Sequence, residues 1–340
     1  MPSSSTQPLQ IGILGAANIA RQFINAVRPS TKVSVRAVAS RDVERARAFA
    51  AETGVAQVHA SYDALLADPA IHAIYNPLPN NLHAEWSIRA ADAGKHVLCE
   101  KPLAAAAAEA KAIFAAAQRN GVYVVEGYPY RAQPQTIKLR ELLRANTIGR
   151  LLLIQASFGF PLADASNIRM DPTLAGGALM DAGSYPISLV RTVAGERPVR
   201  AHAMARWADS GVDRTLIGSL EFASGLLAQI TATFATARHR HAFIAGDKGI
   251  IETHYYNDTS AAFPPMLEVR RGTGWDAARE TVETAMIAGF LAEADAFGDL
   301  VAHGWERWPG ATPDESIDIA LTIDALGKSA RTGAAVEIGE

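Results

Sequence analysis

The chain has 340 residues, enough for two domains, and its 49% hydrophobic and 20% charged residues are ordinary for a globular protein. The net charge of −3 gives no basic footprint for nucleic acid, and no apolar stretch reaches the length of a membrane span. The single cysteine, Cys99, excludes an intramolecular disulfide, and the polar start Met1–Pro8 lacks the features of a signal peptide. We therefore expect a soluble cytoplasmic protein with neither a nucleic-acid nor a membrane partner.

Residues 9–126 alternate short strand patterns with helix patterns. Six strands separated by helices predict a doubly wound, mostly parallel sheet, which is a Rossmann domain of the α/β class. Ligands of such sheets bind beyond the carboxyl ends of the strands. Strands are predicted at 10–14, 33–39, 57–59, 71–75, 96–99 and 122–126, and helices at 18–27, 42–53, 83–93 and 104–120.

The segment that joins the first strand to the first helix has the small residues of a dinucleotide-binding loop. Gly15, Ala17 and Ala20 take the positions of the tight turn, the approach to pyrophosphate and the helix–strand packing. The helix N-terminus supplies N–H groups and partial positive charge for phosphates. The alternative is a small-residue turn of any α/β protein, because alanine replaces two of the three glycines. The residues expected at the cofactor here are Gly15, Ala16, Ala17, Asn18 and Ile19.

The second predicted strand ends in Ala39-Ser40-Arg41-Asp42, where an NAD enzyme usually carries an acid for the ribose 2′-hydroxyl. Ser40 takes that position, and Arg41 follows it. A small hydroxyl and a guanidinium suit a 2′-phosphate, because they avoid like-charge repulsion and can bond two oxygens. The alternative is a solvated Arg41 before a helix-capping Asp42. We expect NADP as the cofactor, and NAD stays open.

The fourth and fifth predicted strands are followed by further candidates. Pro77, Leu78, Asn80 and His83 are expected to flank the path of the cofactor, with a proline-rich turn as the alternative. Glu100-Lys101-Pro102 stands at the carboxyl end of the fifth strand, so Lys101 would enter the nucleotide crevice. A lysine beside a cationic nicotinamide ring holds its proton less tightly, which suits proton transfer. A surface lysine before a helix-starting proline is the alternative.

The pattern changes after about residue 150. Successive strands, several joined by tight turns, predict a large, mostly antiparallel open sheet with helices, an α+β arrangement. We expect a NAD(P)-binding Rossmann domain at 1–127 and an α+β substrate-binding and oligomerisation domain at 128–340. The strands are predicted at 151–160, 199–207, 215–222, 226–234, 241–246 and 249–254, and the helices at 177–194, 284–303 and 314–332.

Five segments resemble, in order along the chain, the glucose–fructose oxidoreductase / inositol dehydrogenase / MocA (Gfo/Idh/MocA) family. The specific part is Glu100-Lys101-Pro102 followed by Asp181 and Tyr185 four residues apart. The resemblance implies Lys101 as a catalytic residue, and Asp181 and Tyr185 as residues of the substrate pocket. It also implies a homodimer or homotetramer through the C-terminal sheet. The matching segments are residues 15–20, 75–83, 94–103, 126–131 and 176–186.

The residue at position 185 indicates which class of substrate to expect. Family members that act on inositol usually carry His there, whereas the glucose–fructose oxidoreductase and dihydrodiol dehydrogenase branches carry Tyr. We therefore expect hydride transfer between nicotinamide and an aldose, keto-sugar or related cyclic alcohol. Tyr185, polarised by Lys101, would exchange the proton of the reacting hydroxyl or carbonyl, and Asp181 would position a substrate hydroxyl on the same helix face.

Other candidates are weaker. Arg131 is expected at the cofactor or substrate, with a surface salt bridge as the alternative. Arg169 and Phe158 are candidates for the substrate pocket, although sheet packing is the default for the phenylalanine. Glu100 is counted among the cofactor residues, and Gln133 stands where the family often has His. No His, Cys or carboxylate set has metal-ligand spacing, so no metal is expected.

Two other functions stay open. One is an enzyme that keeps its cofactor bound and either shuttles hydride between two sugars or cleaves a glycosidic bond. The missing signal peptide disfavours the periplasmic sugar–sugar type. The other is a non-enzymatic sensor that retains the dinucleotide fold, and the intact set of Lys101, Asp181 and Tyr185 argues against it.

Overall fold

A computed structural model describes residues 7–339, which divide into two compact units. The first unit contains residues 7–104, 108–132 and 288–310, and the second contains 105–107, 133–287 and 311–339. Most of the polar start of the chain, residues 1–6, lies outside the described residues. Each unit has its own sheet and is described by itself.

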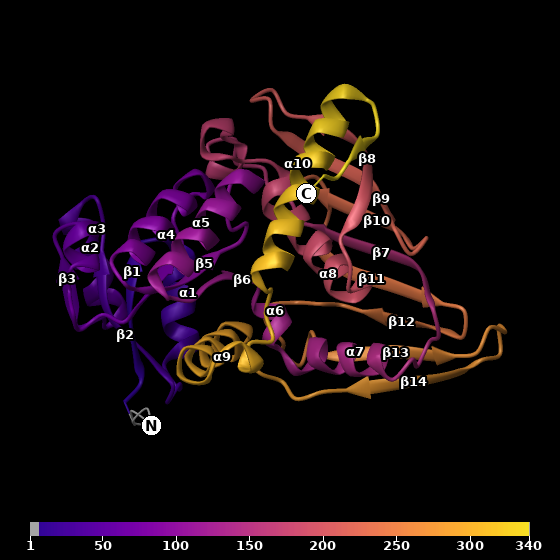
Figure 1. Ribbon diagram of the computed structural model, residues 1–340, viewed down its shortest axis with the longest axis horizontal. Coiled ribbons are helices and arrows are strands. Elements are labelled where there is room, and N and C mark those ends of the chain that lie inside the picture. The colour runs from indigo at the N-terminus through magenta and orange to yellow at the C-terminus, as the bar shows by residue number, and fades with distance from the viewer. Residues whose placement is uncertain (1–6, 340) are drawn as a thin grey trace. The chain divides into compact units, whose positions relative to one another are not determined.

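The first unit is built on a six-stranded parallel sheet with the order β3-β2-β1-β4-β5-β6. The order reverses between β1 and β4, which is the position where doubly wound sheets bind ligands at their carboxyl edge. This order confirms the predicted Rossmann sheet, whose strands and intervening helices Figure 1 shows. The strands are β1 (Leu9–Leu14), β2 (Val33–Ala39), β3 (Gln57–His59), β4 (Ala73–Asn76), β5 (His96–Glu100) and β6 (Val124–Gly127).

The helices of this unit begin and end at the signals that the sequence carries. The Asp42 side chain accepts hydrogen bonds from two backbone N–H groups at the start of α2, and the Ser61 side chain accepts one at the start of α3. Gly54 closes α2 in the left-handed conformation. The helices are α1 (Asn18–Val27), α2 (Val43–Thr53), α3 (Tyr62–Leu66), α4 (His83–Asp92), α5 (Ala107–Asn120), α6 (Pro129–Ala132) and α9 (Gly289–His303).

Helix α9 comes from late in the sequence but completes the core of the first unit. Its buried Phe290 lies edge-on to Phe23, with ring centroids 5.9 Å apart, and Phe23 stacks on Tyr75 at 4.0 Å. The sequence pattern indicates one boundary after residue 127 and a helix from 284 in the second domain, whereas this helix begins at Gly289 and belongs to the first unit. Periodicity indicates which face of a helix is apolar but not which core that face fills.

The second unit contains a nine-stranded sheet with the order β14-β13-β12-β11-β7-β10-β9-β8-β15. Every neighbouring pair is antiparallel except β10 and β7, which confirms the large, mostly antiparallel open sheet. The strands are β7 (Leu151–Gly159), β8 (Pro198–Trp207), β9 (Asp213–Phe222), β10 (Leu227–Thr233), β11 (His239–Gly246), β12 (Gly249–Thr253), β13 (Met266–Arg271), β14 (Ala278–Glu283) and β15 (Val336–Glu337).

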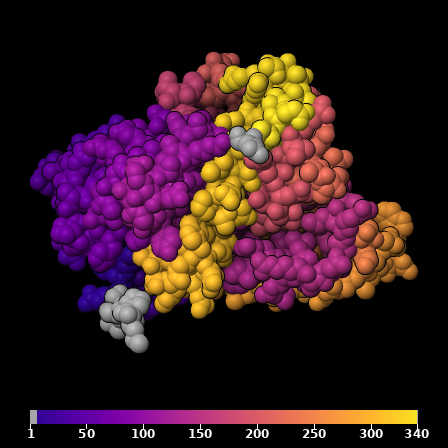
Figure 2. Space-filling model, viewed as in Figure 1, coloured from indigo at the N-terminus to yellow at the C-terminus, as the bar shows by residue number. Residues whose placement is uncertain are grey.

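Helices α8 (Ser184–Ala194) and α10 (Pro313–Thr332) pack on each other and on this sheet, and α7 (Pro134–Arg144) packs on β13. Figures 1 and 2 show the orange end of the β13–β14 hairpin projecting at the edge of the unit, where Trp275 is 94% exposed. Neither strand of this hairpin was predicted from the sequence. Nearly all side chains of β14 are exposed, so the strand has no alternating apolar pattern to detect.

Candidate active site

The dinucleotide loop has the geometry that a pyrophosphate requires. Gly15 adopts a φ of +87°, its N–H donates to the Ala39 carbonyl at 2.7 Å, and a Cβ atom there would lie 3.1 Å from Leu78 Cδ2. Ala17, which precedes α1, has no side-chain oxygen to cap the helix, and the first turn carries no acid. The N-terminal N–H groups of α1 therefore suit a phosphate.

Two arginines stand near this loop. Asp42 accepts hydrogen bonds from the backbone N–H groups of Glu44 and Arg45, at 2.9 and 3.1 Å, so its carboxylate serves as the helix cap. Arg41 is exposed directly after the buried Ser40, and Arg45, one helical turn later, donates to the Ala16 carbonyl at 3.2 Å. The loop thus has two guanidinium groups in its neighbourhood, of which only Arg41 was predicted from the sequence.

His83 is buried between the two turns that follow β4 and β5. Its Nδ1 atom lies 2.7 Å from the Pro102 carbonyl oxygen, and its Nε2 atom lies 2.7 Å from that of Leu78. Burial lowers the pKa of His83 to about 4, so the ring is neutral at pH 7 and only one nitrogen donates. The ring joins these two turns, and its predicted contact with the cofactor stays a prediction.

Glu100 and Lys101 stand at the carboxyl end of β5. The Tyr75 hydroxyl donates to the buried Glu100 carboxylate at 2.6 Å, and Lys101, partly exposed, begins the following turn. Arg131, on α6, has no exposed surface, so the alternative of a surface salt bridge does not hold. Burial raises the pKa of Glu293, on α9, well above its usual range, and the charge of Glu100 adds to this effect.

In the second unit, Asp181 lies in a π-helical turn (Leu179–Gly183), and Tyr185 lies in the first turn of α8. The sequence pattern predicts a regular helix from 177, which is wrong at this turn. The turn is held from β9, because the buried Asp213 carboxylate accepts a hydrogen bond from the Leu179 N–H at 2.7 Å. Single π-turns inside helices occur frequently at functional sites.

Arg169 and Asp181 form an ion pair, with Nε 2.7 Å from Oδ2. Arg169 lies in a short 3-10 turn (Ile168–Met170), and its side chain is more exposed than that of Asp181. The two predicted pocket residues therefore present a paired carboxylate and guanidinium, which are suitable hydrogen-bonding groups for a polyhydroxy ligand.

Tyr185 is buried among aromatic and polar side chains of the same unit. Its ring lies edge-on to that of Phe158 at 5.4 Å between centroids, and its hydroxyl oxygen accepts a hydrogen bond from Asn257 Nδ2 at 2.8 Å. The guanidinium carbon of Arg240 lies 4.0 Å from the centroids of both rings. The structure thus brings the predicted Phe158 and Tyr185 together.

Comparisons with known proteins agree with this description. Residues 9–128 match the model of the oxidoreductase family with an NAD-binding Rossmann fold (GFO_IDH_MocA), and residues 136–252 match the GFO/IDH/MocA C-terminal domain. A D-xylose 1-dehydrogenase (NADP(+)) from Haloferax volcanii is 38% identical over 334 residues, covering 97% of this chain and all of the relative.

The chain belongs to the Gfo/Idh/MocA oxidoreductase family.

Two other proteins are similar to most of the chain. A trans-1,2-dihydrobenzene-1,2-diol dehydrogenase of Danio rerio is 34% identical over 257 residues, covering 74% of this chain and 77% of the relative. A 3-ketoreductase from Actinomadura kijaniata, solved with NADP, has a TM-score of 0.81 at 28% identity, covering 95% of this chain and 98% of that one. The resemblance inferred from the sequence is confirmed at the level of the family.

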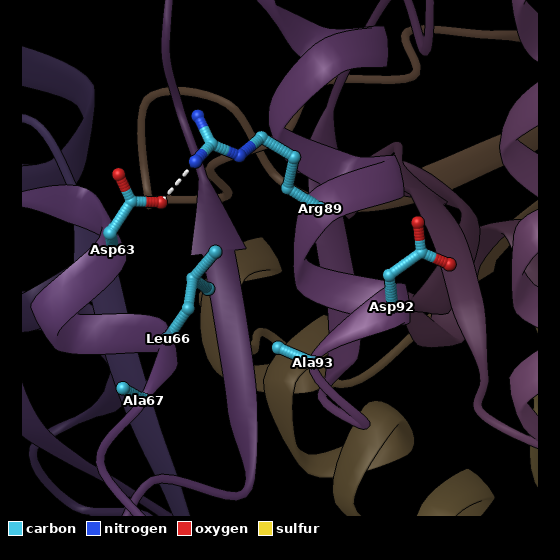
Figure 3. A pocket seen from close by; sticks show the side chains of 6 residues that line it. All are labelled: Asp63, Leu66, Ala67, Arg89, Asp92 and Ala93. Carbon is cyan, nitrogen blue, oxygen red and sulfur yellow. Dashed lines mark hydrogen bonds and ion pairs between the residues drawn. The ribbon is translucent and has the colours of Figure 1, made fainter.

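A hollow of about 360 Å³ lies elsewhere in the first unit, between α3 and α4. Figure 3 shows Arg89 reaching across it to form an ion pair with Asp63, with Leu66 and Ala93 on its walls. Both helices end here, and crossover helices of parallel sheets run from the carboxyl edge back to the amino edge. The hollow therefore belongs to the opposite edge of the sheet from the family's motif residues.

Two further findings bear on ligands. Among residues 7–339, no three or more His, Cys, Asp and Glu side chains are grouped so as to hold a metal ion. In the same part of the chain, no helix combines the length and the apolar character needed to cross a bilayer.

Sequence reasoning missed five residues of these sites. Arg45 could have been found, because it lies in the first turn of the helix that begins directly after Arg41 and Asp42. The other four lie far along the chain from the groups that they contact, so no local pattern marks them. The missed residues are Arg45, Asp213, Arg240, Asn257 and Glu293.

Proposed function

We propose that this protein is an NADP-dependent dehydrogenase or reductase that transfers hydride between nicotinamide and a sugar or related cyclic alcohol. The observation that carries the proposal is the buried phenol of Tyr185, whose oxygen is hydrogen-bonded by Asn257, with the Arg169–Asp181 pair on the segment that precedes its helix. An acid/base group near hydroxyl-binding groups is what oxidation of a polyol requires. The names of the relatives support a sugar or a cyclic diol as the substrate.

The residues take distinct roles in this proposal. Bound nicotinamide dinucleotide accepts or supplies the hydride. Lys101 and Tyr185 exchange the proton of the reacting hydroxyl or carbonyl, and Asp181, held by Arg169, accepts a hydrogen bond from a substrate hydroxyl. Phe158 presents an apolar ring toward the sugar. The residues proposed to hold the cofactor are Gly15, Ala16, Ala17, Asn18, Ile19, Ser40, Arg41, Arg45, Pro77, Leu78, Asn80, His83, Glu100, Lys101 and Arg131.

The catalytic roles are tested by an NADP-linked activity screen over aldoses, keto-sugars and inositols. On the best substrate, Lys101→Ala and Tyr185→Phe should each lower kcat/KM by about 10²- to 10⁴-fold, the usual contribution of general acid–base catalysis. Binding of NADPH to Tyr185→Phe, followed by its fluorescence, should stay within twofold of the parent protein. Near-parental turnover of both variants would remove the assignment.

The preference for NADP follows from charge at the end of β2. Arg41 and Arg45 are both exposed, and Ser40 puts a small hydroxyl group at the position where an NAD enzyme usually carries an acid. A hydrogen bond to a charged group contributes about 1.5–3 kcal/mol, so Arg41→Ala with Arg45→Ala should raise KM for NADP at least tenfold. KM for NAD should change little. Arg47→Ala, which removes an exposed arginine of the same helix that pairs with Glu44, is the matched control.

We further propose that the open face of the nine-stranded sheet binds a second copy of the chain, as a dimer or within a tetramer. Met204 and Ile217 are directly opposite each other on β8 and β9, and they are 66% and 38% exposed. Apolar cross-strand pairs on a solvent face suit association. Met204→Glu with Ile217→Lys should lower the mass measured by sedimentation, whereas an unchanged mass would exclude this face.

A further inference from the structure

Arg240 is a buried cation whose surroundings are mainly aromatic. It lies on β11 and is 6% exposed. Its guanidinium carbon stands 4.0 Å from the ring centroids of Phe158 and Tyr185 and 5.6 Å from that of Tyr255. Aromatic faces attract a cation through their quadrupole, more strongly when both partners are removed from water. The sheet register explains the placement, because Arg240 pairs with Phe158 across β11 and β7.

Asn257 connects Arg240 to the Tyr185 hydroxyl. Arg240 Nη1 donates to Asn257 Oδ1 at 3.0 Å and to the Tyr255 carbonyl at 3.1 Å, while Asn257 Nδ2 lies 2.8 Å from the Tyr185 oxygen. A guanidinium only donates hydrogen bonds, so the amide oxygen must face it. The amide nitrogen then faces the phenol, and the phenol oxygen is the acceptor. The buried Gln133 holds this segment, because its Nε2 donates to the Asn257 carbonyl at 2.5 Å.

We propose that Arg240 and Asn257 are positioning residues that stabilise Tyr185 as a phenolate and so set the pH at which it exchanges a proton with the substrate. This inference rests on the proposed function, in which Tyr185 is the acid/base group. A positive charge over the ring and a hydrogen bond donated to the oxygen both favour the charged form over the neutral one. Neither residue needs to touch the substrate for this effect.

Other polar groups of the same unit oppose or leave unchanged the ionisation of Tyr185. Asp181, in the preceding turn, opposes ionisation of the phenol, but its carboxylate is paired with Arg169 at 2.7 Å. Tyr255 contributes no charge as a hydrogen-bond donor, because its hydroxyl donates to the Ser157 carbonyl at 3.0 Å. The buried guanidinium of Arg240 lies against the ring, and Lys101, which the proposed function places beside Tyr185, would favour ionisation in addition.

The proton balance of the step is simple. In the oxidation direction, the substrate O–H bond breaks and its proton joins the Tyr185 phenolate. The C–H bond breaks in the same reaction, and hydride passes to the oxidised nicotinamide that the proposed function supplies, which leaves a carbonyl. Reduction is the reverse, with the Tyr185 hydroxyl as the proton donor. The phenolate form limits oxidation at low pH, so a shift of its ionisation shifts the pH profile.

The test measures ionisation of Tyr185 directly and through catalysis. Tyrosinate ultraviolet absorption is titrated for the holoenzyme, and the same titration of Tyr185→Phe is subtracted. Arg240→Met should move ionisation to higher pH by about one unit, which lowers kcat/KM for oxidation about tenfold at neutral pH and restores it on raising the pH. Asn257→Asp should move it at least as far, because a carboxylate adds negative charge and cannot donate. Arg240→Lys should restore part of the shift.

The matched control is Arg238→Met, two residues before Arg240. Arg238 is exposed and lies 5.6 Å from the Phe160 ring, so its loss should leave the ionisation of Tyr185 unchanged. An unchanged titration in Arg240→Met and Asn257→Asp would overturn the inference. If Arg240→Met does not fold, Asn257→Asp decides alone, because Arg240→Lys keeps the positive charge. Near-parental turnover of Tyr185→Phe would instead overturn the proposed function, while the titration still reports on Arg240.

Discussion

The dinucleotide loop and the surroundings of Tyr185 are built in opposite ways. The loop is made of consecutive residues and acts through its backbone, with a positive φ at Gly15 and the N-terminus of α1. The phenol of Tyr185 is held by side chains that are distant in sequence, such as Asn257, 72 residues further on. The first site should therefore depend on local conformation, and the second on the packing of its whole unit.

The largest effect that distinguishes the two regions is expected at Gly177. Its φ is +116°, and a Cβ atom there would lie 2.3 Å from Asp213 Oδ1. Gly177→Ala must displace Asp213, which releases the Leu179 N–H that begins the segment leading to Tyr185. Backbone strain and a lost charged hydrogen bond together should cost about 3 kcal/mol or more of unfolding free energy. Denaturant unfolding measures this loss.

The control for Gly177 is Gly195, which follows the helix to which this segment leads. Gly195, which ends α8, has a φ of +71° and open space where a Cβ atom would be, so Gly195→Ala should cost only about 1–2 kcal/mol. NADPH affinity should stay within twofold in both variants. If Gly177→Ala lowered the magnitude of the free energy of NADPH binding by more than it lowered the free energy of unfolding, the dinucleotide loop would not be independent of the surroundings of Tyr185.

The difference between a site of consecutive residues and a site held by distant residues also decided what the sequence could predict. The Rossmann strands and the loop at Gly15 depend on neighbouring residues, so periodicity and turn chemistry predicted them. The cap at Asp42 is equally local, and the sequence offered it as the alternative at the end of the second strand. Arg240 reaches Tyr185 only because β11 pairs with β7 in a particular register. A single sequence does not contain that register, since a shift of one residue would turn Arg240 to the other face of the sheet.

Two features of the structure depend on residues that are distant in sequence, and the sequence did not predict them. Asp181 and Tyr185 were expected on one regular helix, but the π-turn that precedes α8 is held by Asp213 from another strand. Glu293 belongs to the core of the first unit although it follows most of the second in sequence. In both cases, contacts with residues distant in sequence decide the outcome, and local propensity does not contain them.

The second prediction concerns the pH dependence of stability, which should have opposite signs at His83 in the first unit and Asp213 in the second. Burial lowers the pKa of His83 to about 4, so below pH 6.5 the unfolded chain binds a proton that the folded chain does not. The contribution of His83 to stability is therefore lost as the pH falls from 6.5 toward 4, by about 2 kcal/mol at pH 5. In the second unit, burial raises the pKa of Asp213, so its contribution to stability is lost as the pH rises.

Hydrogen exchange resolved by segment measures the pH dependence of local stability in each unit separately. Between pH 7 and pH 5, after correction for intrinsic rates, protection should fall around Leu78 and Pro102 more than around Leu179. His96 adds to the acid sensitivity, because burial also lowers its pKa to about 4. His83→Gln isolates the contribution of His83 and should reduce the pH dependence in the first unit. Equal loss of protection around Leu78 and Leu179 would contradict the prediction.

The smallest expected effect is at Gly15. Gly15→Ala places a Cβ atom 3.1 Å from Leu78 Cδ2 and puts alanine at a φ of +87°, which costs about 1–2 kcal/mol. Relief of this strain moves the loop that is proposed to bind the pyrophosphate, so the Kd for NADPH should rise about tenfold, whereas kcat at saturating NADP should stay near parental.

The control for Gly15 is Gly54→Ala. Gly54 has a similar φ of +73° at the end of α2 and open space where a Cβ atom would be, so only the melting temperature should fall. Ionisation of Tyr185 should be unchanged in both variants, because both leave in place the Asn257 and Arg240 contacts that are proposed to tune the phenol. A shift of that ionisation in Gly15→Ala would show that the loop acts on Tyr185. The dinucleotide loop and the surroundings of Tyr185 would then not be independent of each other.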